Sequence, residues 1–168
     1  CCGEGENAVV SLLDHLRDKG RDSIPDMPNI WINDKGKIIK REAFPEVDLD
    51  SLPVIEYLPD NYYGFHGGKI HRFAQDHKLF RRYALYGGTC HMMITTRGCP
   101  FYCGYCANAY TMTVFGKKIR KRSVESCISE LKLVKQDPYV IYINFEDDWF
   151  FSHDREWMLK FSEEYKRH

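Results

Sequence analysis

Three cysteines lie within one stretch of eight residues, with the spacing C-x3-C-x2-C: Cys99, Cys103 and Cys106. Thiolates held this close repel one another unless a soft cation binds them, so the stretch is predicted to fold as a loop around a metal site. The chain has seven cysteines, an odd number without the spacing of a disulfide framework, which favours a reducing compartment. Three thiolates without an obvious fourth ligand leave one metal position open. In a [4Fe-4S] cluster that position is an iron with no protein ligand.

A zinc site is the alternative interpretation of the same cysteines, with Cys90 or His91 as the fourth ligand. Zinc ligands usually come as two pairs, whereas these come as a triplet. The strand predicted between His91 and the cysteines would span about 20 Å, which puts Cys90 and His91 at its far end. A non-catalytic iron–sulfur or zinc-binding structural module is therefore the second hypothesis for this chain.

Strand and helix patterns alternate in the second half of the chain. The predicted order is a strand over 91–96, the cysteine segment, a loop to Gly116, a helix from Ser123, a strand over 139–145 and a helix from Ser152 or Asp154. The second strand is an almost continuous apolar run, as in parallel strands that are covered on both faces. Such alternation predicts an α/β fold with a parallel sheet or barrel. Two strands cannot close a barrel, so the rest of this domain is expected to be missing. The chain starts at Cys1 without a methionine and ends at His168 within a helical pattern, which we interpret as a piece cut at both ends, with a lipid-anchored N-terminal cysteine as the alternative.

The first half of the chain has weaker patterns. A helix is predicted over 8–20, with one buried face. The apolar positions of that face are Ala8, Val9, Leu12, Leu13 and Leu16. A β-hairpin over 30–39 and a short capped turn over 48–53 follow. Residues 54–88 are rich in Tyr, Gly and His without a clear period, which indicates a connecting segment. The predicted domains are 1–53, a linker over 54–88, and 89–168.

With the aromatic Tyr105 just before its last cysteine, the motif resembles the signature of the radical S-adenosylmethionine (radical SAM) superfamily. The resemblance implies that Cys99, Cys103 and Cys106 ligate a [4Fe-4S] cluster and that S-adenosylmethionine binds the open iron. It also implies reductive cleavage of S-adenosylmethionine to a 5'-deoxyadenosyl radical, with electrons from a donor such as flavodoxin or ferredoxin. Tyr105 would pack near the adenine, although an aromatic here is equally typical of ordinary loop packing.

Two further motifs resemble the branch of that superfamily that often carries an N-terminal cobalamin-binding domain. They are Arg120-x-Arg122-Ser123 at a helix start and Glu146-Asp147-Asp148-x-Phe150 after a strand. The resemblance implies that 1–53 is the tail of a doubly wound cobalamin-binding domain and that 89–168 holds the first βα units of a partial (β/α) barrel. The cobalamin ligand motif D-x-H-x-x-G is not in this chain, so cobalamin would be bound only by the full-length protein. The implied chemistry is radical formation or cobalamin-dependent methyl transfer on an unidentified small-molecule substrate.

Three consecutive carboxylates, Glu146, Asp147 and Asp148, follow the second predicted strand. They stand where many radical SAM enzymes have a Gly-Gly-Glu-Pro motif that contacts the amino group of S-adenosylmethionine. A carboxylate at this place suits a charged ammonium group, since the hydrogen bond is charge-assisted. The alternative is that one of the three caps the following helix, as Asp commonly does.

Charge and hydropathy exclude several classes of partner. Lys plus Arg and Asp plus Glu both number 24, so the chain has no net charge and is not expected to bind nucleic acid. The basic run over 117–122 is interpreted as solvated surface. No apolar stretch approaches about 18 residues and no secretory signal is visible, so we expect a cytoplasmic protein without membrane contact. Cys127, on an apolar helix face, is predicted to be a small buried residue.

Overall fold

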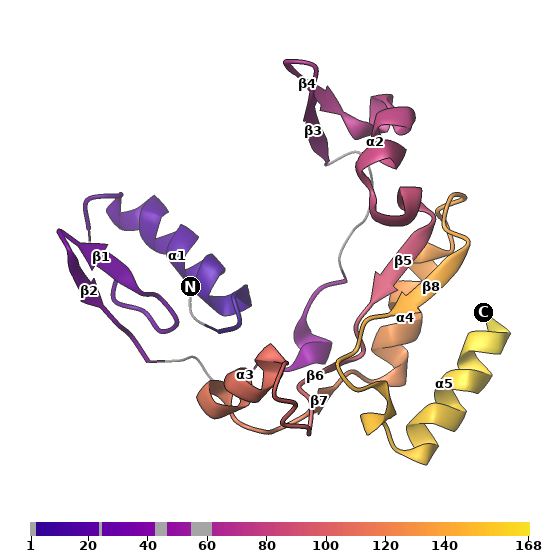
Figure 1. Cartoon of the computed structure of the whole chain (residues 1–168). Coiled ribbons are helices and arrows are strands. Elements are labelled where there is room, and N and C mark those ends of the chain that lie inside the picture. The colour runs from indigo at the N-terminus through magenta and orange to yellow at the C-terminus, as the bar shows by residue number, and fades with distance from the viewer. Residues whose placement is uncertain (1–2, 24, 43–46, 55–61) are drawn as a thin grey trace. The chain divides into compact units, whose positions relative to one another are not determined.

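The computed structural model describes residues 3–23, 25–42, 47–54 and 62–168, with the side chains of 114 and 115 excepted. The chain forms two compact units, residues 1–52 and 53–168, each with its own set of elements (Figure 1). Helices and short strands are mixed along the chain, which confirms the predicted α/β class in its general form. No helix within the described residues is both long enough and apolar enough to cross a membrane.

Within its described residues, the N-terminal unit contains one helix, one hairpin and one short 3-10 helix. These are α1 (Glu6–Lys19), β1 (Ile32–Asp34), β2 (Lys37–Ile39) and η1 (Leu49–Ser51). The C-terminal unit has a longer series. Its elements are β3 (Tyr63–His66), β4 (Lys69–Arg72), η3 (Phe73–Gln75), α2 (His77–Tyr83), η4 (Leu85–Gly88), β5 (Cys90–Met93), β6 (Thr96–Arg97), α3 (Ala107–Phe115), β7 (Arg120–Lys121), α4 (Val124–Val134), β8 (Tyr142–Phe145), η5 (Phe150–Ser152) and α5 (Arg155–Arg167).

The predicted helix and hairpin of the N-terminal unit are confirmed. α1 ends at Gly20, whose φ of 75° suits a residue without a Cβ. β1 and β2 pair antiparallel across Lys35 and Gly36, which both have positive φ, as in the tight turn that joins such strands. The predicted burial of the α1 face is wrong, since Ala8 is buried but Leu13 is 61% exposed. A 14-residue helix and two three-residue strands do not enclose an apolar face of that length.

Residues 62–88 contain elements that the sequence did not predict. β3 and β4 form an antiparallel hairpin, and Asp76 begins α2 by accepting a hydrogen bond from the backbone N–H of Leu79 at 2.9 Å. The apolar side chains of these strands are not buried, because Phe65 and Ile70 are both exposed at more than 70%. Burial of an apolar face therefore does not explain the hairpin. The pairing of the two strands depends on the turn at Gly67 and Gly68, which both have positive φ.

The parallel pairing predicted from the strand–helix alternation is confirmed. β5 and β8 pair in parallel, in a register that runs from Cys90 opposite Tyr142 to Met93 opposite Phe145. The backbone N–H of Glu146 donates to the Met93 carbonyl at 2.8 Å, which extends the ladder past the end of both strands. β8 begins at Tyr142, three residues later than the predicted strand over 139–145.

The core of the C-terminal unit lies between the β5–β8 pair and two helices. α4 and α5 pack on one face of the pair (Figure 1). The buried side chains between them are Met93, Val124, Cys127, Ile128 and Phe161. This confirms the predicted burial of Cys127, which is 0% exposed. The prediction that the second strand is covered on both faces is wrong for this chain, because Tyr142 of β8 is 43% exposed and Ile141 just before it is 77% exposed.

Two helix starts agree with the sequence, and one helix was not expected. The Ser123 side chain accepts from the backbone N–H of Ser126 at 3.1 Å, and Asp154 accepts from that of Trp157 at 2.8 Å. These are ordinary N-caps for α4 and α5. The segment after the cysteines, predicted as a loop, is helix α3, which ends at Gly116 with a φ of 90°.

Candidate functional site

The three clustered cysteines lie on residues 98–106, here named the cysteine loop, between β6 and α3. Cys99, Cys103 and Cys106 are partly exposed, and none forms a disulfide. The backbone N–H of Cys106 donates to the Cys103 carbonyl at 3.0 Å, so the last two cysteines share one turn. Gly98 has a φ of 101°, and a Cβ there would lie 3.0 Å from the Lys118 carbonyl oxygen. The loop can therefore begin in this way only with glycine.

The start of the cysteine loop is held by a short antiparallel pair. Thr96 of β6 lies opposite Lys121 of β7, and the backbone N–H of Arg122 donates to the Thr95 carbonyl at 2.8 Å. The basic run over 117–122 is therefore not simply solvated surface, as the sequence had indicated. The side chain of its last member, Arg122, is only 14% exposed. It forms an ion pair with Glu130 and hydrogen bonds to the carbonyls of Ile94 and Ser126.

No group of three or more His, Cys, Asp or Glu side chains among the described residues is arranged to hold a single metal ion. The three thiols of the cysteine loop thus lie near one another in the chain without converging on one point. His91, considered above as a fourth zinc ligand, is 4% exposed and is hydrogen-bonded to Glu130 of α4 at 2.8 Å. The side chain of His91 therefore lies in the interior of the unit, between β5 and α4.

The three carboxylates after β8 have different surroundings. Asp147 is half-buried, and its Oδ1 accepts four hydrogen bonds from the N–H and hydroxyl groups of Thr95 and Thr96, at 2.5–2.8 Å. Glu146 is exposed and accepts a hydrogen bond from the side-chain amide of Asn144. Asp148 is exposed and forms no hydrogen bond or ion pair with any described residue. None of the three caps α5, because that position is filled by Asp154.

Asp147 also explains why the strand predicted over 91–96 is split. β5 ends at Met93, and the N–H groups of Thr95 and Thr96 donate to the Asp147 carboxylate instead of to a neighbouring strand. The chain turns at this point and continues as β6. Thr95 and Thr96, which are 0% and 2% exposed, are two buried polar residues at the site that the sequence did not predict. A usable signal was present, since polar residues at the carboxyl ends of neighbouring parallel strands meet at one edge.

Tyr105 lies in the cysteine loop and is 93% exposed. The negative charge of the Cys103 thiolate, together with a hydrogen bond to it, raises the pKa of Tyr105 above its ordinary value. No hydrogen bond, ion pair or ring contact between described residues joins Tyr105 to Glu146, Asp147 or Asp148. The structure therefore brings Tyr105 to the cysteines but not to the carboxylates.

An aromatic contact joins the cysteine loop to the segment after β8. The rings of Phe101 and Trp149 meet edge to face, with centroids 4.8 Å apart and an interplanar angle of 84°. Trp149 in turn contacts Phe151, with centroids 5.8 Å apart. Edge-to-face pairs of this kind are favourable beyond their buried area. The sequence carries no signal for this contact, because nothing in the spacing of these aromatic residues separates a ring at the site from a ring in a core.

A buried ionic network lies under the site. His91 and Arg122 both bond to the Glu130 carboxylate, at 2.8 and 2.5 Å. Burial alone would raise the pKa of Glu130, but the two hydrogen bonds outweigh it and hold that pKa below its ordinary value. Arg122 also donates to the Ile94 carbonyl, at 3.2 Å, and to Ser126. The network thereby connects β5, α4 and the end of β7.

His153 follows η5 and is 7% exposed. Its ring stacks on Trp157 of α5, with centroids 3.6 Å apart, and its Nε2 lies 2.8 Å from the Thr95 hydroxyl. Burial lowers the pKa of His153 below its ordinary value, and this effect outweighs the attraction of the Asp147 carboxylate. His153 is therefore neutral near pH 7.

We expect the stability of the chain to fall in mild acid because of His153. A lowered pKa in the folded state means that the unfolded chain binds the proton first, so stability is full above the ordinary histidine pKa of about 6.5 and declines below it. Urea unfolding from pH 8 to pH 5 should show this decline, and His153→Gln, which keeps an N–H donor without titrating, should flatten it. An identical pH slope for the variant would contradict the assignment.

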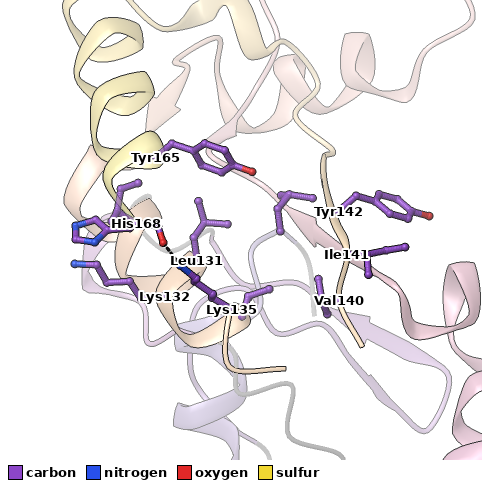
Figure 2. Close-up of a pocket in the computed structure, with 11 residues that line it drawn as sticks. Leu131, Lys132, Lys135, Val140, Ile141, Tyr142, Tyr165 and His168 are labelled. Atoms are coloured by element: carbon purple, nitrogen blue, oxygen red, sulfur yellow. Dashed lines mark hydrogen bonds between the residues drawn. The ribbon is translucent and has the colours of Figure 1, made fainter. Parts of the chain in front are cut away.

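A separate cavity of about 330 Å³ lies at the opposite end of β8 (Figure 2). Its wall is mostly apolar, from Leu131 of α4 to Ile141 and Tyr142, with Lys132 and Lys135 at its edge. The Lys135 ammonium donates to the carbonyl of His168. The cavity is lined by the residues that precede and begin β8, whereas the carboxylates follow β8, so the two features lie at different ends of the strand.

Comparison with known proteins gives an informative similarity. No protein-family model matches the chain. The chain is similar to a protein of Pyrococcus horikoshii (strain OT-3) that is described as an uncharacterized methyltransferase, PH0819. The two are 28% identical over 149 residues, which cover 88% of this chain and 28% of the relative. The chain thus spans little more than a quarter of the length of the relative that it matches.

Proposed function

We propose that the chain is part of a radical S-adenosylmethionine enzyme that carries out methyl transfer, and that the cysteine loop and residues 146–148 contribute to its active site. The carrying observation is that the C-x3-C-x2-C loop follows the first strand of a parallel pair, next to the carboxylates that follow the second. In parallel α/β folds, ligands and reacting groups gather at the carboxyl ends of the strands. The bonds from Thr95 to Asp147 join the carboxylates to the residues that lead into the cysteine loop.

The donors of the cysteine loop suit a [4Fe-4S] cluster. A cluster takes one thiolate per iron, so its three sulfurs are spread apart, whereas a single zinc ion needs its ligands around one point. When bound, the cluster would supply the electron that cleaves S-adenosylmethionine. Cys99, Cys103 and Cys106 would hold it, and the turn between Cys103 and Cys106 would set the spacing of two of them.

The open face of the β5–β8 pair supports the finer fold proposal, a partial (β/α) barrel. Helices cover the outside of such barrels, and side chains from all the strands fill the inside. α4 and α5 cover one face here, and Met92 and Tyr142 stand exposed on the other. That exposed face would be the inside of the barrel in a longer protein.

The contacts of the three carboxylates favour two of them as partners for the ammonium group of S-adenosylmethionine. The Oδ1 of Asp147 already accepts four hydrogen bonds, and its Oδ2 is buried. Glu146 and Asp148 are exposed and retain acceptor oxygens. A carboxylate and an ammonium form a short, charge-assisted hydrogen bond. Tyr105, with its exposed ring, would be available to the adenine.

Methyl transfer is the reaction that the similarity favours, because the relative from P. horikoshii is described as a methyltransferase. S-adenosylmethionine would then be the methyl donor as well as the source of radicals. The N-terminal unit would correspond to the end of a cobalamin-binding domain, and cobalamin would be held only by the full-length protein. Flavodoxin or ferredoxin would supply the electrons. The methyl acceptor would be a small molecule.

The proposal is tested by anaerobic reconstitution of the chain with iron and sulfide, followed by metal and sulfide analysis. We expect about four irons and four sulfides per chain. The variant Cys99→Ala/Cys103→Ala/Cys106→Ala should bind none. Cys90→Ser is the matched control, because Cys90 is also a partly exposed thiol but lies at the far end of β5.

The reconstituted chain should also bind S-adenosylmethionine, with a change in the electron paramagnetic resonance (EPR) spectrum of the reduced cluster. Glu146→Gln/Asp148→Asn should weaken that binding without loss of iron. Tightly bound zinc would instead support the structural module, and iron binding that persists in the triple cysteine variant would remove the basis of the proposal.

A further inference from the structure

Asp147 is the centre of a buried hydrogen-bond network at the carboxyl ends of β5 and β8. Its Oδ1 accepts from the backbone N–H groups of Thr95 and Thr96, at 2.8 and 2.5 Å, and from their hydroxyls, at 2.8 and 2.7 Å. Both threonines are almost fully buried. Hydrogen bonds to an ionised acceptor are about twice as strong as neutral ones, and low solvent access strengthens them further.

His153 extends this network, and only one direction of hydrogen-bond donation is possible between His153 and Thr95. The hydroxyl of Thr95 has one proton, and the Asp147 carboxylate can only accept it. Thr95 Oγ1 must therefore accept from the Nε2 of His153, which lies 2.8 Å away. The network thus assigns the proton of the neutral ring to Nε2 and leaves Nδ1 as an acceptor, which is buried and without a partner among the described residues. The direction of donation is from His153 to Thr95 to Asp147.

The network acts on the start of the cysteine loop. Thr95 and Thr96 are followed by Arg97, by Gly98 with its positive φ, and then by Cys99. The opposite side of the same segment is fixed by β7, through the bond from Arg122 to the Thr95 carbonyl. The backbone of Thr95 is therefore held at its N–H by Asp147 and at its carbonyl by Arg122. Little backbone freedom is left before the first cysteine.

Asp147 is also poorly suited to bind a ligand. Its Oδ2 is buried and has no partner among the described residues, so an incoming ammonium group could reach it only if the network opened. Its neighbour Asp148 has no such constraint, because it is exposed and unbonded. The two adjacent aspartates thus have different environments although their side chains are the same.

We infer that Asp147 and His153 are positioning residues that act through Thr95 to fix the start of the cysteine loop. The consequence for cluster retention rests on the proposed function, whereas the constraint on the backbone does not. Asp147 holds the two threonine amides, and His153 keeps the Thr95 hydroxyl aligned toward Asp147. The stack of His153 on Trp157 ties this alignment to α5.

Four variants test the inference. Asp147→Asn removes the charge, and Thr95→Val removes the hydroxyl at nearly constant shape. Thr95→Ser restores the hydroxyl, and Asp148→Asn is the matched control for a neighbouring exposed aspartate. In the metal-free chain, amide hydrogen exchange at Thr95, Thr96 and Cys99 should accelerate about tenfold or more in the first two variants, as expected when a charge-assisted bond is lost. The other two variants should exchange as the wild type does.

A spectroscopic signature checks the part played by His153. Long-range proton–nitrogen NMR spectra of the wild type should report Nε2 as the protonated nitrogen. In Thr95→Val the two nitrogens should report a mixture of tautomers, and in Thr95→Ser the single tautomer should return. A mixture in the wild type, or no change in Thr95→Val, would overturn the assigned direction of the network.

Reconstituted chains provide the last readout. Asp147→Asn and Thr95→Val should retain iron about tenfold less well than the wild type and show an altered EPR spectrum per folded chain. Altered amide exchange with unchanged iron retention and an unchanged spectrum would overturn the positioning role. If the wild type itself binds no iron, the proposed function fails, and the exchange and NMR results still decide whether the network fixes the loop.

Discussion

Arg122→Met is expected to destabilise the chain by about 3–5 kcal/mol, because it removes one partner of a buried ion pair. Glu130 is 7% exposed and would keep only the hydrogen bond from His91. The loss of the second bond leaves a buried carboxylate that is incompletely paired, which costs much more than the ion pair itself is worth. Urea unfolding near pH 7, followed by circular dichroism, measures the effect.

The matched control is the neighbouring basic residue. Lys121→Met should change the free energy of unfolding by less than about 1 kcal/mol, because Lys121 makes only a 4.0 Å ion pair with Asp154, whose side chain is 67% exposed. The double variant Arg122→Met/Glu130→Met should lose less than the sum of its single variants, since it removes both charges together. Equal effects of Arg122→Met and Lys121→Met would mean that the network is not formed in solution.

The Arg122 result also tests how the site is supported. The backbone N–H of Arg122 bonds to Thr95, its carbonyl accepts from the Trp157 side chain at 2.9 Å, and its guanidinium bonds to the Ile94 carbonyl. One residue thus supports both the end of β5 and the start of α5. Loss of its side chain should loosen the approach to the cysteine loop as well as lower global stability.

The features that the sequence predicted correctly depend on local signals. The caps of α4 and α5 follow from Ser123 and Asp154, because each side chain bonds to a backbone group three residues ahead. The parallel pair follows from strand–helix alternation, which allows few other topologies. Glycine explains the end of α1 at Gly20. In each case the determining residues are close together in the chain.

The features that the sequence did not predict depend on contacts across the chain. The sequence predicts Asp147 as a site residue, but the bonds of Asp147 to Thr95 and Thr96 span about fifty residues and require the register of β5 on β8. The basic neighbours of Arg122 predict a solvated surface run, whereas its guanidinium bonds to Glu130, eight residues on in α4. Residue type alone cannot reveal which charge of a run is buried.

The apolar pattern of a strand also cannot tell how many of its faces are covered. The run before residue 145 predicted a strand covered on both sides, which is correct only if further elements lie over the second face. The described residues cover one face alone. The same sequence is therefore consistent with an inner barrel strand in a longer protein and with a half-exposed strand in this chain.

Substitution of two adjacent methionines of β5 measures separately how far each face of the strand pair is covered. Met93→Ala is expected to destabilise the chain by about 2–5 kcal/mol, because Met93 is 0% exposed between the strand pair and α4 and α5. Met92→Ala should change the free energy of unfolding by about 0.5 kcal/mol or less, since Met92 points to the open face and is 37% exposed. Both substitutions remove the same atoms from the same strand.

Urea unfolding of the two variants at low protein concentration gives the comparison. A large effect of Met93→Ala with a small effect of Met92→Ala fits a strand pair that is covered by helices on one side only. A comparable loss in Met92→Ala would mean that the second face is covered in solution, and dependence of that loss on protein concentration would identify the cover as another copy of the chain. In a longer protein with further strands, Met92→Ala should become as costly as Met93→Ala, because the open face would then be the interior of the barrel.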